Sequence, residues 1–369
     1  MEKESRRIDG LDFLRGIASF GVCWFHLTTF HYTSPDGPFY HLVRSSGAYG
    51  WLGVEVFFVI SGFVIPYSLY RARYELKNYT TFILKRVIRL DPPYLVSLVL
   101  ILVLAYAYGL YTGKAAVVEG APISVTRVAL HLGYLNMFFS QPWLNPAFWT
   151  LAIEFQYYLI MGLVFPLVRS RSRWVRIAFL ICFALPAFFD RPTLMTGGVP
   201  YSRFIFQFGF LFVMGIASFQ RWVELIGRWE YAISICLATV GAFFTSGLAP
   251  ALAGLFAIVC INLYNHRNFI SAFFGNISYS LYLLHWPLGH LTLSVIGNKF
   301  VGAQTDIAKT GMLILTLGVC LMSSYLLYRL VERPAQQWSS RIKYGRRSRP
   351  SIVEEVSGIA PAAPTNAGI

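Results

Sequence analysis

The chain has 369 residues, of which 56% are hydrophobic and only 13% are charged. A soluble domain carries about 25% charged residues, so this composition excludes an ordinary soluble enzyme and indicates an integral membrane protein. The net charge of +14 would suit a nucleic-acid-binding protein, but the basic residues lie between long apolar runs, where such residues set helix orientation. We therefore expect the lipid bilayer, and no nucleic acid, as a partner.

The apolar runs predict an all-α, polytopic membrane helix bundle. A membrane-spanning helix needs about 20 mostly apolar residues. About ten such helices are expected, near residues 10–31, 49–70, 92–111, 148–168, 174–190, 203–220, 230–246, 248–264, 277–297 and 307–331. Two connecting segments, 32–48 and 112–147, are long, and the second contains a stretch from Val128 to Ser140 that is typical of a short interfacial or re-entrant helix.

The distribution of basic residues predicts the orientation of this bundle. With the N-terminus in the cytoplasm, most of the 31 Lys and Arg residues fall on the cytoplasmic side, as the positive-inside rule requires. An even number of helices then returns the basic C-terminal segment to the same side. We expect a cytoplasmic N-terminus (residues 1–9), one membrane domain (residues 10–334) and a basic tail (residues 335–369) that is disordered.

The first predicted helix carries an ionisable pair, Arg15 and His26. Eleven residues are almost three helical turns, so both side chains point to nearly the same face, roughly 16 Å apart along the axis. Asp12 lies one turn before Arg15 and can pair with it. Ionisable residues inside a membrane span mark a functional site by default. The alternative is that Arg15 is a topological anchor and His26 a hydrogen-bonded core histidine.

Two further predicted helices carry buried carboxylates. Glu55, in GVEVFFVISGF, falls in the outer half of its helix, and Ser61 follows near mid-membrane. Glu154, in FWTLAIEFQYY, lies at a depth similar to that of His26, with Trp149 at the interface before it. A carboxylate near a histidine is a plausible general-base pair; the alternative is a structural charge pair.

The remaining candidates lie on a late helix and beside an early one. His285 follows Tyr279 in ISYSLYLLH. Lys85, Arg86 and Arg89, in FILKRVIRLDPPY, are expected in the loop before the helix at 92–111. Three neighbouring cations can hold phosphate groups, although they also suit topology and anionic lipid. The sequence shows no cluster with metal-ligand spacing, so no metal site is predicted.

In combination, these motifs resemble acyltransferase family 3 of membrane proteins. The family hallmark, an Arg followed by ten residues and a His in the first helix, is matched by Arg15 and His26. Further matches are LDFLRGIA, GVEVFFVISGF, KRVIRLDPPY, FWTLAIEFQYY, ISYSLYLLH and the ERP at 332–334, which occur in family order between residues 10 and 334.

This resemblance implies transfer of an acyl group, often acetyl, from cytoplasmic acyl-CoA to a hydroxyl of a carbohydrate, such as a surface polysaccharide or a lipid-linked sugar. It also implies a bacterial inner membrane. Acyl-CoA is then a co-substrate, and no permanently bound cofactor is expected. The oligomeric state and the identity of the acceptor stay open.

Within this resemblance the candidate residues receive roles. His26 is the expected general base or transient acyl carrier, and Glu154 orients it. Arg15, Arg86 and Arg89 are expected to bind the acyl-CoA phosphates. The expected cavity residues are Asp12, Glu55, Ser61, Trp149, Tyr279 and His285. The alternative function is a proton-coupled transporter or exporter, which would not consume acyl-CoA.

Overall fold

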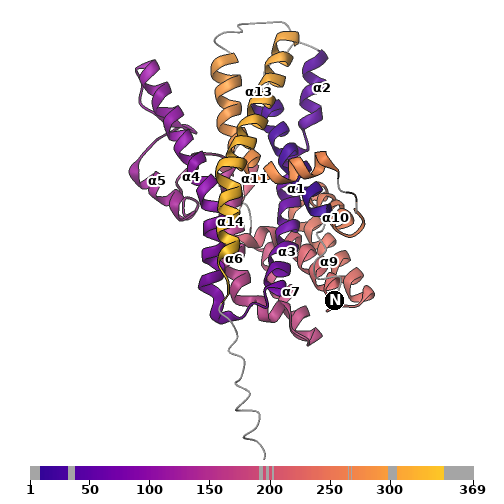
Figure 1. Ribbon diagram of the computed structural model, residues 1–369. Helices are drawn as coiled ribbons and strands as arrows, with labels where there is room; N and C mark the ends of the chain where they lie inside the picture. Colours follow the sequence, from indigo (N-terminus) through magenta and orange to yellow (C-terminus); the bar gives the residue numbers. More distant parts are fainter. Residues whose placement is uncertain are drawn as a thin grey trace, which may run out of the picture.

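The computed structural model describes residues 9–31, 38–190, 194–196, 199–201, 203–264, 266, 268–297 and 306–344. These residues form a predominantly helical molecule (Figure 1), with two short antiparallel strand pairs, β1 (Val117–Val118) with β2 (Ala121–Pro122) and β3 (Leu194–Thr196) with β4 (Val199–Tyr201). The predicted all-α class is therefore confirmed.

The helices follow the predicted apolar runs closely. Their bounds are α1 (Asp9–His26), α2 (Pro38–Gly47), α3 (Gly53–Arg71), α4 (Tyr79–Thr112), α5 (Val125–Leu132), α6 (Phe148–Val168), α7 (Arg173–Ala184), α8 (Gly209–Trp222), α9 (Arg228–Ser246), α10 (Leu248–Leu263), α11 (Phe269–Gly289), α13 (Asp306–Leu327) and α14 (Arg333–Arg341). Short π-helical stretches extend α1 through His31, α11 through Gly297 and α13 through Glu332.

Four of the described helical runs are long and apolar enough to cross a membrane. They are His41–Arg71, Leu76–Thr112, Phe148–Val168 and Ala308–Arg341. Apolar helices of this length need a bilayer, because about 20 residues span its hydrocarbon core. The protein is therefore an integral membrane protein, whereas the count of ten spanning helices and their orientation stay predictions.

The largest departure from the prediction is α4. We expected a loop up to residue 91 and a helix near residues 92–111, where the apolar run lies. That boundary is wrong: α4 is one helix of 34 residues that contains Pro92 and Pro93 in its interior. Proline inside a membrane helix is tolerated where neighbouring groups satisfy the freed carbonyls. As a consequence Lys85, Arg86 and Arg89 lie on a helix and not in a loop.

Two connecting regions also differ from the expected boundaries. Segment 32–48 contains the unexpected helix α2, and the short helix in segment 112–147 is α5, which begins at Val125 and not at Val128. Residues 335–341 of the predicted tail belong to α14, which packs on α4. The tail beyond residue 344 lies outside the described residues.

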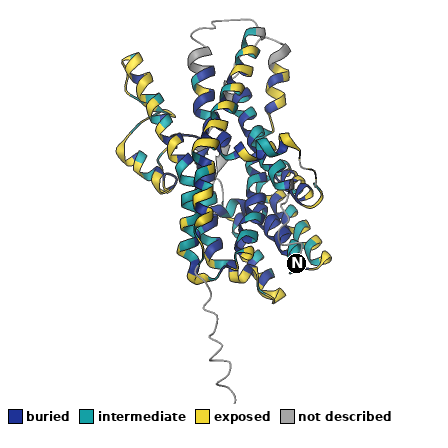
Figure 2. Ribbon diagram, in the orientation of Figure 1, coloured by how far each residue is buried: buried dark blue, intermediate teal, exposed yellow. Residues whose placement is uncertain are grey.

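Glycines set the closest helix contacts of the bundle. α1 packs along α11, where a Cβ on Gly16 would lie 2.8 Å from the Cβ of Phe274. α3 packs along α8, where a Cβ on Gly215 would lie 2.2 Å from the carbonyl oxygen of Val59. Small residues let membrane helices approach closely. These contacts fix α1, α3 and α11 around the buried interior (Figure 2).

Candidate active site

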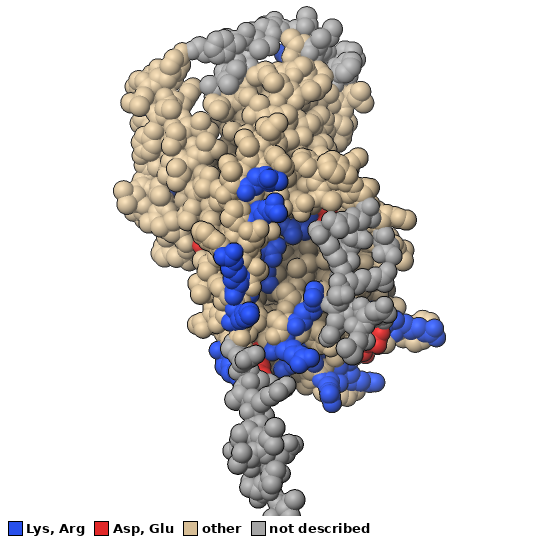
Figure 3. Space-filling view, viewed as in Figure 1, with Lys and Arg blue, Asp and Glu red and all other residues tan. Residues whose placement is uncertain are grey.

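A cavity lies among α1, α3, α4, α6 and α11, next to the end of α13. Its empty volume is about 930 Å³, including its open mouth. Figure 3 shows Lys and Arg side chains gathered around a hollow in the lower half of the face in view. Six of the predicted site residues line the cavity although they come from five helices: Arg15, Ser61, Arg86, Arg89, Glu154 and Tyr279.

The cavity contains three guanidinium groups with few partners. Arg86 donates to Ser68 Oγ over 2.7 Å, and its guanidinium lies over the ring of Tyr158 at 5.6 Å. In the part of the chain that the structure describes, Arg15 and Arg89 form no hydrogen bond or ion pair. Arg89 lies close enough to Arg15 and Arg86 to experience their charge. Three guanidinium groups held close together favour an anionic ligand.

Glu154 lies in the same cavity and is held by two hydroxyl groups. Ser61 Oγ donates to Glu154 Oε1 over 3.0 Å, and the hydroxyl of Tyr158 donates to the same oxygen. Tyr158 follows Glu154 by four residues on α6, so the two side chains share a helix face. Sequence reasoning missed Tyr158, which the helical spacing from Glu154 could have found.

A second carboxylate, Glu332, enters the cavity wall from the π-helical stretch between α13 and α14. It is buried and accepts hydrogen bonds from Ser280 Oγ at 2.6 Å and from Gln336 Nε2 at 2.9 Å. Arg15 and Arg89 are close enough to interact with it electrostatically. The sequence showed Glu332 only as part of the ERP motif and gave it no role. π-Helical stretches often accompany functional sites because they redirect a side chain.

The two candidate histidines form a pair. The ring centroids of His26 and His285 lie 5.1 Å apart, and Trp286 packs edge-on against His26 at 5.1 Å. His285 is fully buried, and its Nδ1 contacts the carbonyl oxygen of Leu281 over 3.1 Å. Its Nε2 has no hydrogen-bond partner among the described residues.

Tyr282 contacts both the cavity and the histidine pair. Its side chain lines the cavity, and its ring centroid lies 5.7 Å from that of His285. Its hydroxyl shares a hydrogen bond of 2.6 Å with Thr150. Neither His26 nor His285 is among the described residues that line the cavity. The pairing of Glu154 with His26 stays a prediction. Tyr282, which the sequence did not single out, lies beside the histidine pair.

Besides His285, three other predicted cavity residues lie outside the described lining. Trp149 is buried and packs against Phe208 with ring centroids 5.7 Å apart. Glu55 is only 6% exposed, and its Oε2 has no hydrogen-bond partner among the described residues. Asp12 packs its backbone on Gly275. The possible Asp12–Arg15 pair is not formed between these described side chains. None of these three residues is among those described as lining the cavity.

Comparison with known proteins now decides the family. The family model described as an acyltransferase domain, that of acyltransferase family 3, matches residues 8–329. The chain belongs to acyltransferase family 3. The match covers α1 to the start of the π-helical stretch after α13, and therefore includes almost every element of the cavity.

The individual proteins that match this chain are distant relatives. The chain is 23% identical to the O-acetyltransferase OatA of Staphylococcus aureus strains NCTC 8325 and COL, over 382 aligned positions that cover 90% of this chain and 58% of OatA. It thus spans less than two thirds of OatA. An uncharacterized protein of Haemophilus influenzae is 29% identical over 143 positions, which cover 36% of this chain and 56% of that protein. No solved structure gives a significant match.

Proposed function

We propose that this acyltransferase moves an acyl group, in the first place acetyl, from cytoplasmic acyl-CoA to a hydroxyl of a carbohydrate. The acceptor class is a surface polysaccharide or a lipid-linked sugar, and the location is the bacterial inner membrane, crossed several times. One observation carries the proposal: a single cavity brings three sparsely partnered guanidinium groups together with a carboxylate that two hydroxyl groups orient.

The guanidinium groups supply the recognition of the donor. Arg15, Arg86 and Arg89 converge from α1 and α4, and a guanidinium binds phosphate with charge-assisted hydrogen bonds. The phosphates and pyrophosphate of acyl-CoA are ligands of this kind. Arg15 and His26 both lie on α1, so the distance of roughly 16 Å along its axis gives the pantetheine arm a path toward His26.

Transfer needs a base for the acceptor hydroxyl. We assign this role to His26: the hydroxyl oxygen attacks the thioester carbonyl, its proton passes to His26, the C–O bond forms and the C–S bond breaks. The proton then leaves with the CoA thiol. A general base contributes typically 10²–10⁴-fold. Glu154 accepts hydrogen bonds from Tyr158 and Ser61. It orients the reacting groups next to Tyr282 and balances the positive charge of the cavity.

The acceptor assignment draws support from the relatives. OatA is named as an O-acetyltransferase, and an O-linked acceptor is a hydroxyl. Segments 32–48 and 112–147 separate predicted helices on the outer side, where a carbohydrate would approach. An acceptor there and a donor in the cytoplasm place the transfer step inside the bundle, near His26.

The test is transfer from radiolabelled acetyl-CoA by purified protein in liposomes, with cell-envelope glycan as the acceptor. We expect release of CoA and labelled glycan, and a loss of at least about 100-fold in His26→Ala and Glu154→Gln, with both variants still eluting as folded protein. Full activity in His26→Ala removes its role as base. Absence of any thioester turnover favours the transporter.

A further inference from the structure

A second hollow, separate from the cavity, runs between α7 and α9. The two helices flank α8, whose Phe210 and Val213 form its floor. Apolar side chains form its walls, among them Ile181 of α7 and Ile233 and Leu237 of α9, which are 54%, 59% and 64% exposed. Its empty volume is about 1030 Å³, including open space. We call it the α7–α9 groove; it shares no lining residue with the cavity.

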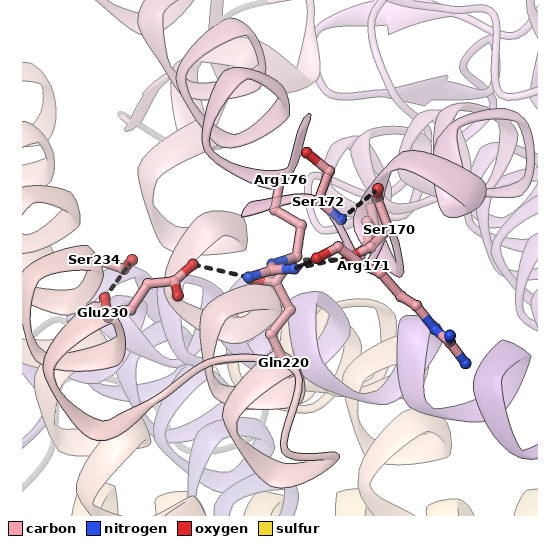
Figure 4. A network of polar contacts seen from close by, with 8 residues as sticks. Ser170, Arg171, Ser172, Arg176, Gln220, Glu230 and Ser234 are labelled. Carbon is pink, nitrogen blue, oxygen red and sulfur yellow. Dashed lines mark hydrogen bonds and ion pairs between the residues drawn. The ribbon is translucent and has the colours of Figure 1, made fainter. Parts of the chain in front are cut away.

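An ion pair whose arginine is buried lies at one end of the groove. Arg176 Nη2 lies 3.1 Å from Glu230 Oε1 and joins the first turn of α7 to the first turn of α9. Arg176 Nη1 also donates to the carbonyl oxygens of Ser170 and Arg171. Figure 4 shows this network, with Arg176 between the two helix starts. This ion pair links the two helix starts at the groove end.

This end of the groove is strongly basic. Segments 169–176 and 221–230 hold six arginines against two glutamates. Arg173 lines the groove itself. Both α7 and α9 begin here, so the positive ends of two helix dipoles add to the side-chain charge. The other residues that line the groove carry no charge apart from Glu230, which Arg176 neutralises.

Two exposed tryptophans mark the depth of this end. Trp174 and Trp229 are 66% and 71% exposed. Each carries the guanidinium of its preceding residue over its ring, with Arg173 at 4.6 Å and Arg228 at 5.3 Å from the ring centroids. Tryptophan is enriched at the headgroup level of membranes. The stacking holds both arginines beside these rings, and tryptophans at headgroup level would place them next to lipid phosphates.

We propose that the α7–α9 groove is a binding site for one anionic phospholipid. The phosphate lies between Arg173 and Arg228, and an acyl chain fills the apolar groove. On α7 the groove extends from Arg173 to Ala184, roughly 16 Å at 1.5 Å per residue, which matches about one leaflet of a hydrocarbon core of about 30 Å. A phospholipid of one leaflet has this combination of a charged head and an apolar chain.

The headgroup half of the proposal is tested by native mass spectrometry of the protein in neutral detergent. Phosphatidylglycerol and phosphatidylcholine with the same chains are the probes. We expect phosphatidylglycerol to bind at least tenfold more tightly. The double variant Arg173→Gln with Arg228→Gln should lose this preference. Arg171→Gln is the matched control, because Figure 4 shows its side chain directed away from Glu230; it should retain the preference.

The chain half is tested with a substitution that fills the groove. Leu237→Trp should reduce phosphatidylglycerol binding about tenfold, whereas Val240→Trp, on α9 but outside the groove lining, should not. Both positions are exposed, so both variants should fold. Equal binding of the two lipids overturns the proposal. So does equally tight binding of water-soluble glycerophosphoglycerol, which has the headgroup without the chains.

Discussion

Two regions of the molecule use arginine in opposite ways. In the α5 segment (residues 113–147), Arg127 is 1% exposed and its guanidinium donates to the carbonyl oxygens of Val118, Ala121, Pro122, Pro142 and Trp143. In the cavity, Arg15 and Arg89 have no hydrogen-bond partner within the described chain. Arg127 therefore stabilises the local fold, whereas Arg15 and Arg89 keep their donors available for a ligand.

The α5 segment depends on these hydrogen bonds of Arg127 because it has little regular structure. Glu119, Tyr134 and Ser140 adopt positive φ values of 52°, 58° and 53°, a region that side chains other than glycine rarely occupy. Burial lowers the pKa of Arg127, and the carboxylate of Glu119 opposes this effect. The five carbonyl oxygens that accept hydrogen bonds from the guanidinium compensate its positive charge and hold the segment around it.

His131 and His285 repeat the contrast. In the α5 segment, both ring nitrogens of His131 have partners: Nδ1 contacts the carbonyl oxygen of Arg127 at 2.7 Å, and the Leu144 N–H donates to Nε2 over 3.0 Å. His285, beside the cavity, leaves Nε2 without a partner among the described residues. A buried polar atom without a partner costs free energy, so such atoms concentrate where a ligand or reaction uses them.

The largest expected effect is on stability, from Arg127→Met. The substitution leaves five carbonyl oxygens of an irregular segment without their donor, and each buried unsatisfied group costs roughly 1–3 kcal/mol. We expect a lower thermal midpoint, measured by dye-monitored unfolding in detergent. Lys114→Met, at an exposed position of the same segment, is the control. An Arg127→Met protein as stable as the control would show that the segment does not depend on the hydrogen bonds of Arg127.

The next effect is a pH dependence of stability that comes from His131. Burial lowers the pKa of His131 to about 4 from its usual 6.5, although the carbonyl oxygen of Arg127 opposes the shift. Between these values the unfolded chain binds a proton that the folded chain does not. The free energy of unfolding therefore falls as the pH is lowered from 6.5 toward 4, by up to about 3 kcal/mol.

The thermal midpoint measured from pH 7 to pH 4.5 checks this pH effect. His131→Gln cannot titrate, so its midpoint should be lower at pH 7 and should change less on acidification. A wild-type and a variant curve that fall in parallel would assign the acid sensitivity to other groups.

The smallest expected change in free energy comes from Arg89→Gln, and it should appear in function and not in stability. Removing one of three neighbouring cations relieves the repulsion between them but weakens the binding of phosphate. We expect the KM for acetyl-CoA to rise roughly 10- to 100-fold, about 1.4–2.8 kcal/mol, with an unchanged or higher thermal midpoint. A midpoint that falls as far as in Arg127→Met would place Arg89 with the structural arginines.

Much of the site could be read from the sequence because it lies within single helices. Arg15 and His26 share α1, so their spacing follows from the helical period alone. The cavity lining includes Arg15 together with Ser61, Glu154 and Tyr279, and each of these last three was identified as a polar residue inside an apolar run. The α4 boundary was wrong because the apolar run begins near residue 92, whereas α4 begins at Tyr79 and includes the basic residues before that run; in the fold α4 packs against α11 and α14.

The sequence by itself determined the membrane class, the helical elements and a short set of polar residues whose burial in a membrane costs free energy. Hydrophobicity and helical periodicity are local properties of the chain, so they can be read from it directly. Only the tertiary structure decided which of these residues meet. It brought Glu332 beside Arg15 and Arg89, placed Tyr282 against both the cavity and His285, and left Glu55 and Trp149 outside the described cavity lining. The physical reason is that these meetings depend on how glycine contacts set the distance and rotation between helices.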